Sequence, residues 1–441
     1  MTPSVDQLRL RDPCLGAVAE AVLAGGRLDR ELAVAVATSL DLLGVGRLAN
    51  LVRERLHGGR TYFVRNRHLN PTNVCEADCM FCAYKANPGD PGGWTLTREQ
   101  IQERIREMVT EDIREVHVVG GHNPEVGYDY FVDTLRWIKE VRPEVHVKAY
   151  TMAEIHFFAR ISGKSVEEVV TDLKAAGLDA CTGGGAEILG ERVRKKIVRG
   201  KVDGAGWLDV ARRVHRMGVK SNCTMLYGHI EKPEDKVEHL LMLRELQDET
   251  GGFQAFIPLA FHNENNRLRK LDPPTGLDDL MNLAVGRLLL DNIPHIKAYW
   301  PMHTPKLAQA ALWMGVDDVD GTVVEEHIYH MAGATTDQAM SVEEIVELIR
   351  AAGREPIECV GPGFPGRQQD QQEPLVGGGR LEVDGRDACR RAAGAERQGE
   401  FGRTRRLLGN HEEGEPPAAA AGYGDRSFIA HAAEPELESA R

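Results

Sequence analysis

The sequence predicts an α/β fold, namely a (β/α)8 TIM-type barrel or, as the alternative, an open partial barrel. Short apolar runs alternate with amphipathic helical stretches along most of the 441 residues, which is typical of parallel βαβ units. Polar residues gather directly after these runs, and the composition changes after Glu358. We therefore expect an N-terminal helical extension at 1–60, a barrel at 61–358 and a separate tail at 359–441.

The first 60 residues predict helices. Leu32, Val36, Leu40, Leu43 and Leu48 recur at near-helical spacing, and a Gly-Gly-Arg break follows from position 58. This break separates a helical cap from the first predicted strand.

Eight apolar runs predict the strands of the barrel. They lie at 62–69, 116–119, 145–149, 178–181, 220–226, 253–258, 296–300 and 319–323. Amphipathic helices are predicted between most of them, at 98–109, 128–141, 166–176, 236–247 and 277–290. We expect the barrel to end near Gly321 and a last helix to run from Ser341 to Ala352.

The tail from 359 to 441 is rich in Gly, Arg, Gln, Glu, Pro and Ala and has few aliphatic residues. A segment of this composition buries too little apolar area to offset the entropy lost on ordering, so it is predicted to be disordered. One hypothesis for its origin is a change of reading frame. Resequencing the end of the gene, or a search for tail peptides by mass spectrometry, tests that hypothesis.

Three cysteines, Cys75, Cys79 and Cys82, follow the first predicted strand in the pattern C-x3-C-x2-C. Thiolates at this spacing can hold three corners of a 4Fe-4S cube and leave the fourth iron open to a small molecule. Structural zinc is the first alternative, but it needs four ligands and no second Cys or His pair lies nearby in the sequence. A disulfide framework, the second alternative, belongs to short secreted chains. A cluster with an open iron is the prediction.

The other predicted strands are also followed by polar residues, and the loops after the strands are where a parallel barrel carries its chemistry. These loops are 120–124, 151–154, 183–187, 227–231, 261–265, 301–303 and 325–327. A Gly pair such as Gly120-Gly121 is often an ordinary turn, and its functional interpretation needs a ligand close to bare backbone. The convergence of many such loops beside the cysteines predicts one site at this rim.

The net charge of -13 argues against a nucleic-acid-binding surface. No apolar run approaches the roughly 20 residues that a membrane-spanning helix needs. These features predict a cytoplasmic protein with neither nucleic acid nor membrane as a partner, and reducing conditions there suit an oxygen-sensitive cluster.

The stretch 66–84, which reads NRHLNPTNVC up to Cys75 and CMFCAY from Cys79, resembles radical S-adenosylmethionine (SAM) enzymes of the menaquinone and deazaflavin branch. Later motifs look most like the aminofutalosine (aminodeoxyfutalosine) synthase family, and they lie at 148–151, 183–188, 221–231, 251–259, 295–300, 305–309, 320–326 and 330–334. The resemblance covers roughly residues 41–358. It departs from the usual pattern at His122-Asn123, among other positions, which affects the substrate pocket more than the class of reaction.

This resemblance implies that Cys75, Cys79 and Cys82 hold a 4Fe-4S cluster and that SAM, a co-substrate, binds its open iron. It also implies an electron donor such as flavodoxin or ferredoxin. The residues that it suggests for binding SAM are Tyr84, Gly120, Gly121, Glu154 and Glu187.

The reaction implied by the resemblance is addition of the 5′-deoxyadenosyl radical to the enolpyruvyl double bond of 3-((1-carboxyvinyl)oxy)benzoate. The product is 6-amino-6-deoxyfutalosine, an intermediate of the futalosine route to menaquinone. Because this aryl vinyl ether is a dianion, it needs cationic or donor groups. His229, His262 and Lys297 are the candidates, since they lie at predicted strand ends on the same rim.

Two alternatives remain open at the level of the sequence. The cyclic dehypoxanthine futalosine synthase, or a related synthase of the deazaflavin (F420) precursor, would use the same radical for a different reaction. A cluster-carrying electron-transfer protein would have no substrate, but such carriers usually enclose the cluster with four cysteines.

Overall fold

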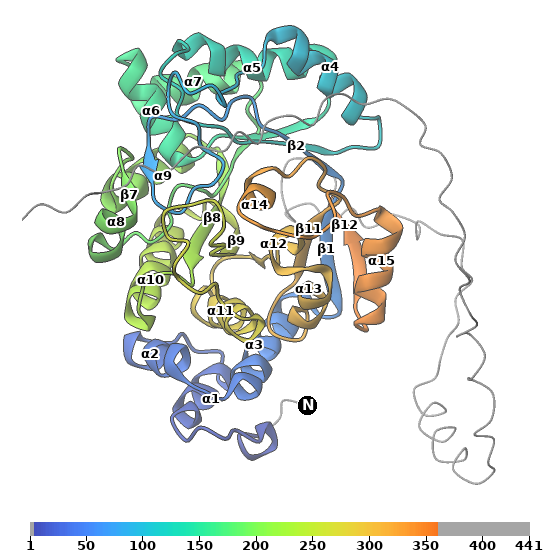
Figure 1. Ribbon diagram of the computed structural model, residues 1–441. Coiled ribbons are helices and arrows are strands. Elements are labelled where there is room, and N and C mark those ends of the chain that lie inside the picture. The colour runs from blue at the N-terminus through green and yellow to red at the C-terminus, as the bar shows by residue number, and fades with distance from the viewer. Residues whose placement is uncertain (1–3, 360–441) are drawn as a thin grey trace, which may run out of the picture. The chain divides into compact units, whose positions relative to one another are not determined.

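The computed structural model describes residues 4–359, and its centre is a parallel barrel (Figure 1). Seven strands pair side by side in the order β10-β9-β8-β6-β5-β4-β2, and every pairing is parallel. Their bounds are β2 (Asn66–Leu69), β4 (Glu115–Val118), β5 (His146–Ala149), β6 (Ala180–Cys181), β8 (Lys220–Tyr227), β9 (Phe253–Ala260) and β10 (His295–Ile296). A smaller sheet has the order β11-β1-β12, with β1 (Arg60–Val64), β11 (Asp318–Gly321) and β12 (Glu355–Glu358).

The two sheets join into one ring. Only Arg65 separates β1 from β2 in the chain, and a parallel bridge between Lys297 and Asp318 links the end of β10 to β11. The predicted fold class is therefore confirmed, with a continuous seven-stranded wall and a narrow link at β10 and β11. β11 ends at Gly321, where the sequence predicts the barrel to end.

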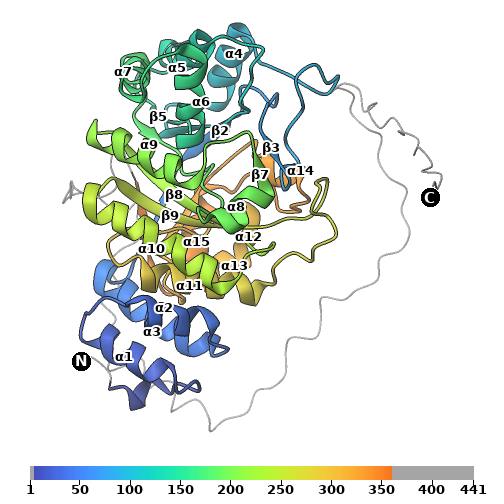
Figure 2. The ribbon, with the colours of Figure 1, turned by 90° about the vertical axis from the view of Figure 1, so that its left-hand side faces the viewer.

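Helices cover the outside of the barrel (Figures 1 and 2). They include α4 (Arg98–Met108), α5 (Tyr128–Val141), α6 (Met152–Ser162), α7 (Val166–Ala176), α9 (Gly204–Arg216), α10 (Pro233–Thr250), α11 (Gly276–Leu289) and α15 (Val342–Ala351). Thr97, Ser165 and Thr275 each close a capping box at a helix start, which fixes where the chain leaves a loop. Ser341 does the same for α15, as the predicted bounds of the last helix require.

The N-terminal helices pack against one side of the barrel, where they lie beside α10 and α11 in both views (Figures 1 and 2). They are α1 (Leu15–Leu23), α2 (Arg30–Thr38) and α3 (Leu42–His57), after a short 3-10 turn at Asp6–Leu8. The predicted apolar stripe is interrupted, because Leu40 is 98% exposed between α2 and α3. Asp41 begins a new helix there by accepting a hydrogen bond from the Gly44 N–H at 2.9 Å.

β12 is a strand that the sequence did not predict. It pairs in parallel with β1, from Arg60 opposite Glu355 to Phe63 opposite Glu358. The Cys359 N–H continues the pairing by donating to the Phe63 carbonyl at 2.8 Å. The rest of the tail predicted at 359–441 lies outside the described residues.

The interior of the barrel is unusually polar at its lower end. Parallel barrels generally fill this space with branched apolar side chains. Here the Lys148 ammonium lies 2.7 Å from the Glu115 carboxylate, and Lys297 lies 3.4 Å from both Asp318 and Asp320. These paired charges form a floor beneath the carboxyl ends of the strands.

Candidate active site

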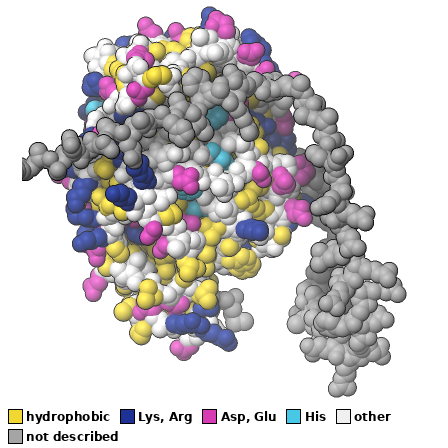
Figure 3. Space-filling model, viewed as in Figure 1, with side chains coloured by type: hydrophobic (Ala, Val, Ile, Leu, Met, Phe, Trp, Pro, Cys, Tyr) yellow, Lys and Arg dark blue, Asp and Glu magenta, His cyan; other side chains and the backbone are white. Residues whose placement is uncertain are grey.

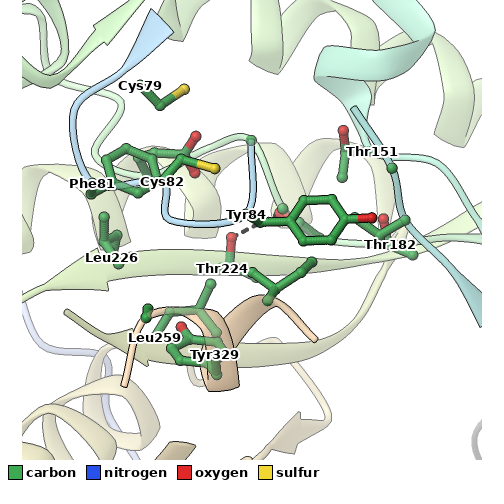
Figure 4. Close-up of a pocket in the computed structure, with 18 of the residues that line it drawn as sticks. Cys79, Phe81, Cys82, Tyr84, Thr151, Thr182, Thr224, Leu226, Leu259 and Tyr329 are labelled. Atoms are coloured by element: carbon green, nitrogen blue, oxygen red, sulfur yellow. Dashed lines mark hydrogen bonds between the residues drawn. The ribbon is translucent and has the colours of Figure 1, made fainter. Parts of the chain in front are cut away.

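A cavity of about 290 Å³ opens at the carboxyl ends of the strands. Its lining includes Cys75, Cys79 and Cys82 together with residues from loops all round the barrel. Figure 4 shows Cys79 and Cys82 on one side of this cavity and Thr151 and Thr182 on the other, with Leu259 and Tyr329 along its lower edge. The predicted rim and the predicted cysteine motif therefore meet in one place.

The cysteine loop is held by backbone pairing with a segment more than a hundred residues later. Its short strand β3 (Asp78–Cys79) pairs antiparallel with β7 (Val198–Arg199), directly after α8 (Glu191–Ile197). The Met80 N–H also donates to the Ile197 carbonyl at 2.9 Å. On the other side of the loop, the His122 N–H donates to the Cys75 sulfur at 3.3 Å. The position of the thiols is thus set by two loops of the rim.

The spread of the three thiols suits a cluster better than a single metal ion. Within the described residues, the only trio of His, Cys, Asp or Glu whose ligand atoms lie within 4.8 Å of one another is His57, His295 and Asp317. The three sulfurs are therefore too far apart for one ion, whereas a cube takes each thiolate on a different iron. The donor set fits a 4Fe-4S cluster with one iron left for another ligand.

The His57, His295 and Asp317 trio is a structural charge network outside the cavity lining, at the amino ends of β10 and β11. Asp317 accepts hydrogen bonds from Arg287 and from His295, both at 2.5 Å. His57 Nε2 lies 2.8 Å from the Pro294 carbonyl. A buried guanidinium already neutralises this carboxylate, so the trio is explained without an ion.

Lys201 is a site residue that the sequence analysis missed. It lines the cavity beside the cysteines, and its ammonium lies 3.1 Å from the Glu187 carboxylate. Burial opposes its charge, but the negative charges of the Cys79 thiolate, of Glu187 and of the other two thiolates outweigh burial and raise its pKa. It follows β7 in the chain, so only the β3–β7 pairing, invisible in the sequence, brings it to the cysteines.

Gly120 and Gly121 line the cavity, but their bare backbone serves the cysteine loop first. A Cβ on Gly121 would lie 2.1 Å from the Val74 carbonyl oxygen and 3.0 Å from the Cys75 Cβ. The Gly121 N–H donates to the Thr72 carbonyl at 2.9 Å, and the Gly120 N–H donates to Glu154 at 3.3 Å. Both amides are thus already engaged, and the Gly121 carbonyl accepts from the Asn123 N–H at 2.9 Å. The Gly120 carbonyl is what this turn offers to a ligand.

Glu154 lies at the start of α6 and lines the cavity opposite the cysteines. Its carboxylate closes a capping box by accepting from the Thr151 N–H at 2.7 Å. Burial raises the pKa of Glu154 to about 7, against the lowering effect of the hydrogen bonds from Thr151 and Gly120. A group with such a pKa changes charge within the physiological range, which is typical of a functional site.

Glu187 and Tyr84 also line the cavity, as predicted. Burial opposes ionisation of Glu187, but Lys201 and Arg194 outweigh it and lower its pKa. The Tyr84 hydroxyl donates to the Thr72 carbonyl at 3.2 Å, and its ring meets Trp94 edge-on at 6.0 Å. Tyr84 is therefore a fixed wall of the cavity.

Of the three residues predicted to bind the substrate, only His262 lies in the cavity lining. His262 lines the cavity and meets Tyr329 edge-on at 5.2 Å. The His229 ring is fully buried outside the cavity lining, with Nε2 3.1 Å from the Leu226 carbonyl and Nδ1 2.7 Å from the Ile230 N–H. Lys297 is also outside the lining, in the ion pairs of the floor.

His68 and His117 line the cavity, and the sequence analysis did not select them. They lie inside β2 and β4, where their alternation with buried residues looks like an ordinary strand. Their position could have been predicted from the strands, because side chains along a barrel strand point alternately outward and into the barrel.

Backbone strain is concentrated at this rim. Tyr150, Glu187, Asp320, Val323 and Glu325 all have φ between 46° and 70°, the left-handed region that non-glycine residues rarely adopt. They follow β5, β6 and β11 or lie at the end of β11. Strain of this kind is usual where a fold must place particular groups at a ligand site.

Comparison with known proteins agrees with this fold and site. Residues 69–243 match the model of the Radical SAM superfamily, and residues 250–359 match the CofH/MqnC C-terminal region. The solved structure of methylornithine synthase superposes with a TM-score of 0.62 at 16% identity, over 77% of this chain and 97% of that chain. The barrel and its cysteine loop thus define a radical SAM protein.

Curated relatives identify the family within the radical SAM superfamily. Aminodeoxyfutalosine synthase of Thermus thermophilus is 48% identical over 79% of this chain and 95% of that protein, and the one of Streptomyces coelicolor is 43% identical over 76% and 90%. The cyclic dehypoxanthine futalosine synthase of Streptomyces coelicolor is 37% identical over 76% and 84%. The chain belongs to the aminodeoxyfutalosine synthase family of radical SAM enzymes. None of its described helices is long and apolar enough to cross a membrane.

Proposed function

We propose that this chain is an aminodeoxyfutalosine synthase, a transferase that joins the 5′-deoxyadenosyl group of SAM to 3-((1-carboxyvinyl)oxy)benzoate. The product is 6-amino-6-deoxyfutalosine, for menaquinone biosynthesis. The observation that carries the proposal is the single cavity that holds the three cysteines, Glu154 and Glu187 in a chain 48% identical to a named synthase over nearly its whole length.

Cys75, Cys79 and Cys82 would hold the cluster, which when bound supplies the electron that cleaves the sulfonium of SAM. Lys201 offsets the negative charge of the thiolates from within the same cavity. Glu154 and Glu187 accept hydrogen bonds, so they suit the ammonium and ribose hydroxyls of SAM. Tyr84, the Gly120 carbonyl and the backbone of Gly121 complete that end of the cavity.

The other end of the cavity would receive the aryl vinyl ether. His262 is retained from the three candidates, because it lines the cavity. His229 and Lys297 do not line the cavity, so they would position neighbouring residues and would not contact the substrate. The walls there include Leu226, Ile257, Leu259 and Tyr329, which exclude water from a reactive radical.

An electron donor such as flavodoxin or ferredoxin would approach beside the cysteine loop. The chain is acidic overall, yet α8 and β7 next to this loop present exposed Arg192, Lys195, Lys196 and Arg199. Figure 3 shows Lys and Arg side chains gathered at the edge where Figure 1 places these elements.

A double charge reversal of Lys195 and Lys196 should slow reduction of the cluster by an acidic carrier but not by dithionite. We also propose a cytoplasmic location, where low-potential carriers and reduced thiols are available.

The test of the proposed function is anaerobic reconstitution with iron and sulfide, followed by reaction with SAM, dithionite and the aryl vinyl ether. Mass spectrometry should find the adenosine-containing adduct. Cys79→Ala should lose both the cluster absorbance and the product, whereas Cys14→Ser, at an exposed cysteine outside the cavity, should retain both. Cleavage of SAM without an adduct would instead favour hydrogen abstraction, the chemistry of the cyclising synthase.

A further inference from the structure

Two histidines face each other across neighbouring strands at the deep end of the cavity. His68 on β2 is in register with His117 on β4, and their rings stack at a centroid distance of 4.8 Å and an interplanar angle of 19°. The Tyr299 ring is parallel to the His68 ring within 4°, at a centroid distance of 6.2 Å. All three residues line the cavity, so the stack presents its ring edges to whatever occupies it.

The ring nitrogens of His68 and His117 make no hydrogen bond within the described part of the chain, and they are absent from the buried polar atoms that lack a partner, so the cavity reaches them. Their neighbours, by contrast, are paired. Glu115 meets Lys148 at 2.7 Å, and Asp320 accepts from the Asn66 amide at 3.0 Å. Each of these two imidazoles can therefore donate an N–H hydrogen bond to a ligand in the cavity.

The ligand that these donors fit is an anion. Among the described residues that line the cavity, the lysines are Lys85 and Lys201, and both lie with the cysteines. Lys85 donates to the Ala77 carbonyl of the cysteine loop at 2.6 Å, and Lys201 is paired with Glu187. An anionic group at the deep end therefore lies away from both ammonium groups and depends on neutral donors. His68 and His117 supply two adjacent ones, and Thr182 and Asn222 also line the cavity.

We propose that His68 and His117 together bind the carboxylate on the aromatic ring of the substrate. The inference rests on the proposed function, which requires the vinyl carbon to lie near SAM and the cysteines. The enol carboxylate is attached beside that carbon, whereas the ring carboxylate lies across the aromatic ring from it. His68 and His117 lie within their strands, below the loop that carries the cysteines, so they meet the distant end.

The experiment compares two compounds on the reconstituted protein. One is the aryl vinyl ether, and the other is the same molecule without the ring carboxylate, 2-phenoxyacrylate. Dissociation constants are measured anaerobically, without reductant, on the wild type, His68→Phe and His117→Phe. Phenylalanine preserves the stack and removes the donors. His156→Phe, on α6 outside the cavity lining, is the matched control.

Each variant should weaken binding of the ring-carboxylate compound by about 10- to 100-fold, the usual range for a lost hydrogen bond to a charged group. Binding of 2-phenoxyacrylate should change little, and His68→Gln should recover part of the loss. Equal losses for both compounds, or no loss, would overturn the proposal. Unchanged cluster absorbance and SAM binding show that a variant is folded. If the wild type binds the compounds but forms no adenosine adduct, the proposed function fails and the recognition result still stands.

Discussion

Lys201 is a buried cation beside three thiols, and its position matters for the redox properties of the site. A positive charge in a low-dielectric cavity stabilises the reduced, more negative form of a neighbouring redox group. The ammonium also pairs with Glu187, so its loss would leave that carboxylate without its partner. Lys201 therefore couples the cysteine end of the cavity to one of the proposed SAM contacts.

Replacing Lys201 with Met should lower the midpoint potential of the reconstituted cluster by several tens of millivolts, since about 59 mV corresponds to a tenfold change in a one-electron equilibrium. The potential is measured by an electron paramagnetic resonance titration without substrate. Lys195→Met is the control, because Lys195 lies on α8 with a 73% exposed side chain. An unchanged or raised potential in Lys201→Met would contradict the electrostatic role.

Glu154 makes stability depend on pH. Its pKa in the folded protein is about 7, above the ordinary 4.5, so folding favours the neutral carboxyl. That contribution is complete below pH 4.5 and is lost as the pH rises through 7. The free energy of unfolding of the wild type, relative to Glu154→Gln, should fall by roughly 3 kcal/mol between pH 4.5 and 8. Urea unfolding at several pH values measures it, and a parallel course of the two proteins would refute it.

The cysteines could be predicted as cluster ligands from their spacing, because the C-x3-C-x2-C pattern needs no long-range contact to be recognised, and all three line the cavity. Glu154 and Glu187 could be placed at the rim because each follows a strand directly. The same rule failed to place His229 and Lys297 in the lining, since the direction of a side chain depends on the local backbone and its partners. Lys201 could not be predicted as a site residue, because its position depends on the pairing of β3 with β7, two segments distant in the sequence.

At the level of elements, the buried network around Asp317 joins four parts of the fold. The Asp317 carboxylate directly precedes β11 and receives Arg287 from α11 and His295 from β10. His57 at the end of α3 lies 3.4 Å away. The narrow link of the barrel ring, between β10 and β11, is therefore reinforced by side chains.

Asp317→Ala should destabilise the protein by about 3–5 kcal/mol, because it leaves the buried Arg287 guanidinium without its counter-charge. The free energy of unfolding in urea at pH 7 measures the loss. Glu191→Ala removes an exposed ion pair on α8 and should change the same quantity by less than about 1 kcal/mol. Similar effects of the two substitutions would show that the network contributes little.

The eight predicted strands correspond to β1 with β2 and to β4, β5, β6, β8, β9, β10 and β11, because each is a short apolar run between helices. β12 was missed, since Glu-Pro-Ile-Glu is neither long nor apolar and becomes a strand only beside β1. β3 and β7 were missed for a similar reason, as each is two residues long and polar or mixed.

At the scale of the whole molecule, the described fold ends at β12, which pairs with the first strand of the barrel. A chain shortened to residues 1–362 should therefore unfold at the same temperature as the full chain, within about 2 °C. A chain ending at residue 352 loses β12 and should unfold several degrees lower. Differential scanning calorimetry distinguishes them. A large loss from the first truncation would mean that the tail contributes to stability.

The pairing of β3 with β7 also has a practical consequence. The strand that carries Cys79 is anchored to a surface segment with trypsin sites at Lys195, Lys196 and Arg199. Iron that locks the thiols in place would hold this segment against its partner, and oxidative loss of iron would release both together. Brief digestion with trypsin should thus reveal, before any assay is run, which fraction of a preparation has survived exposure to air.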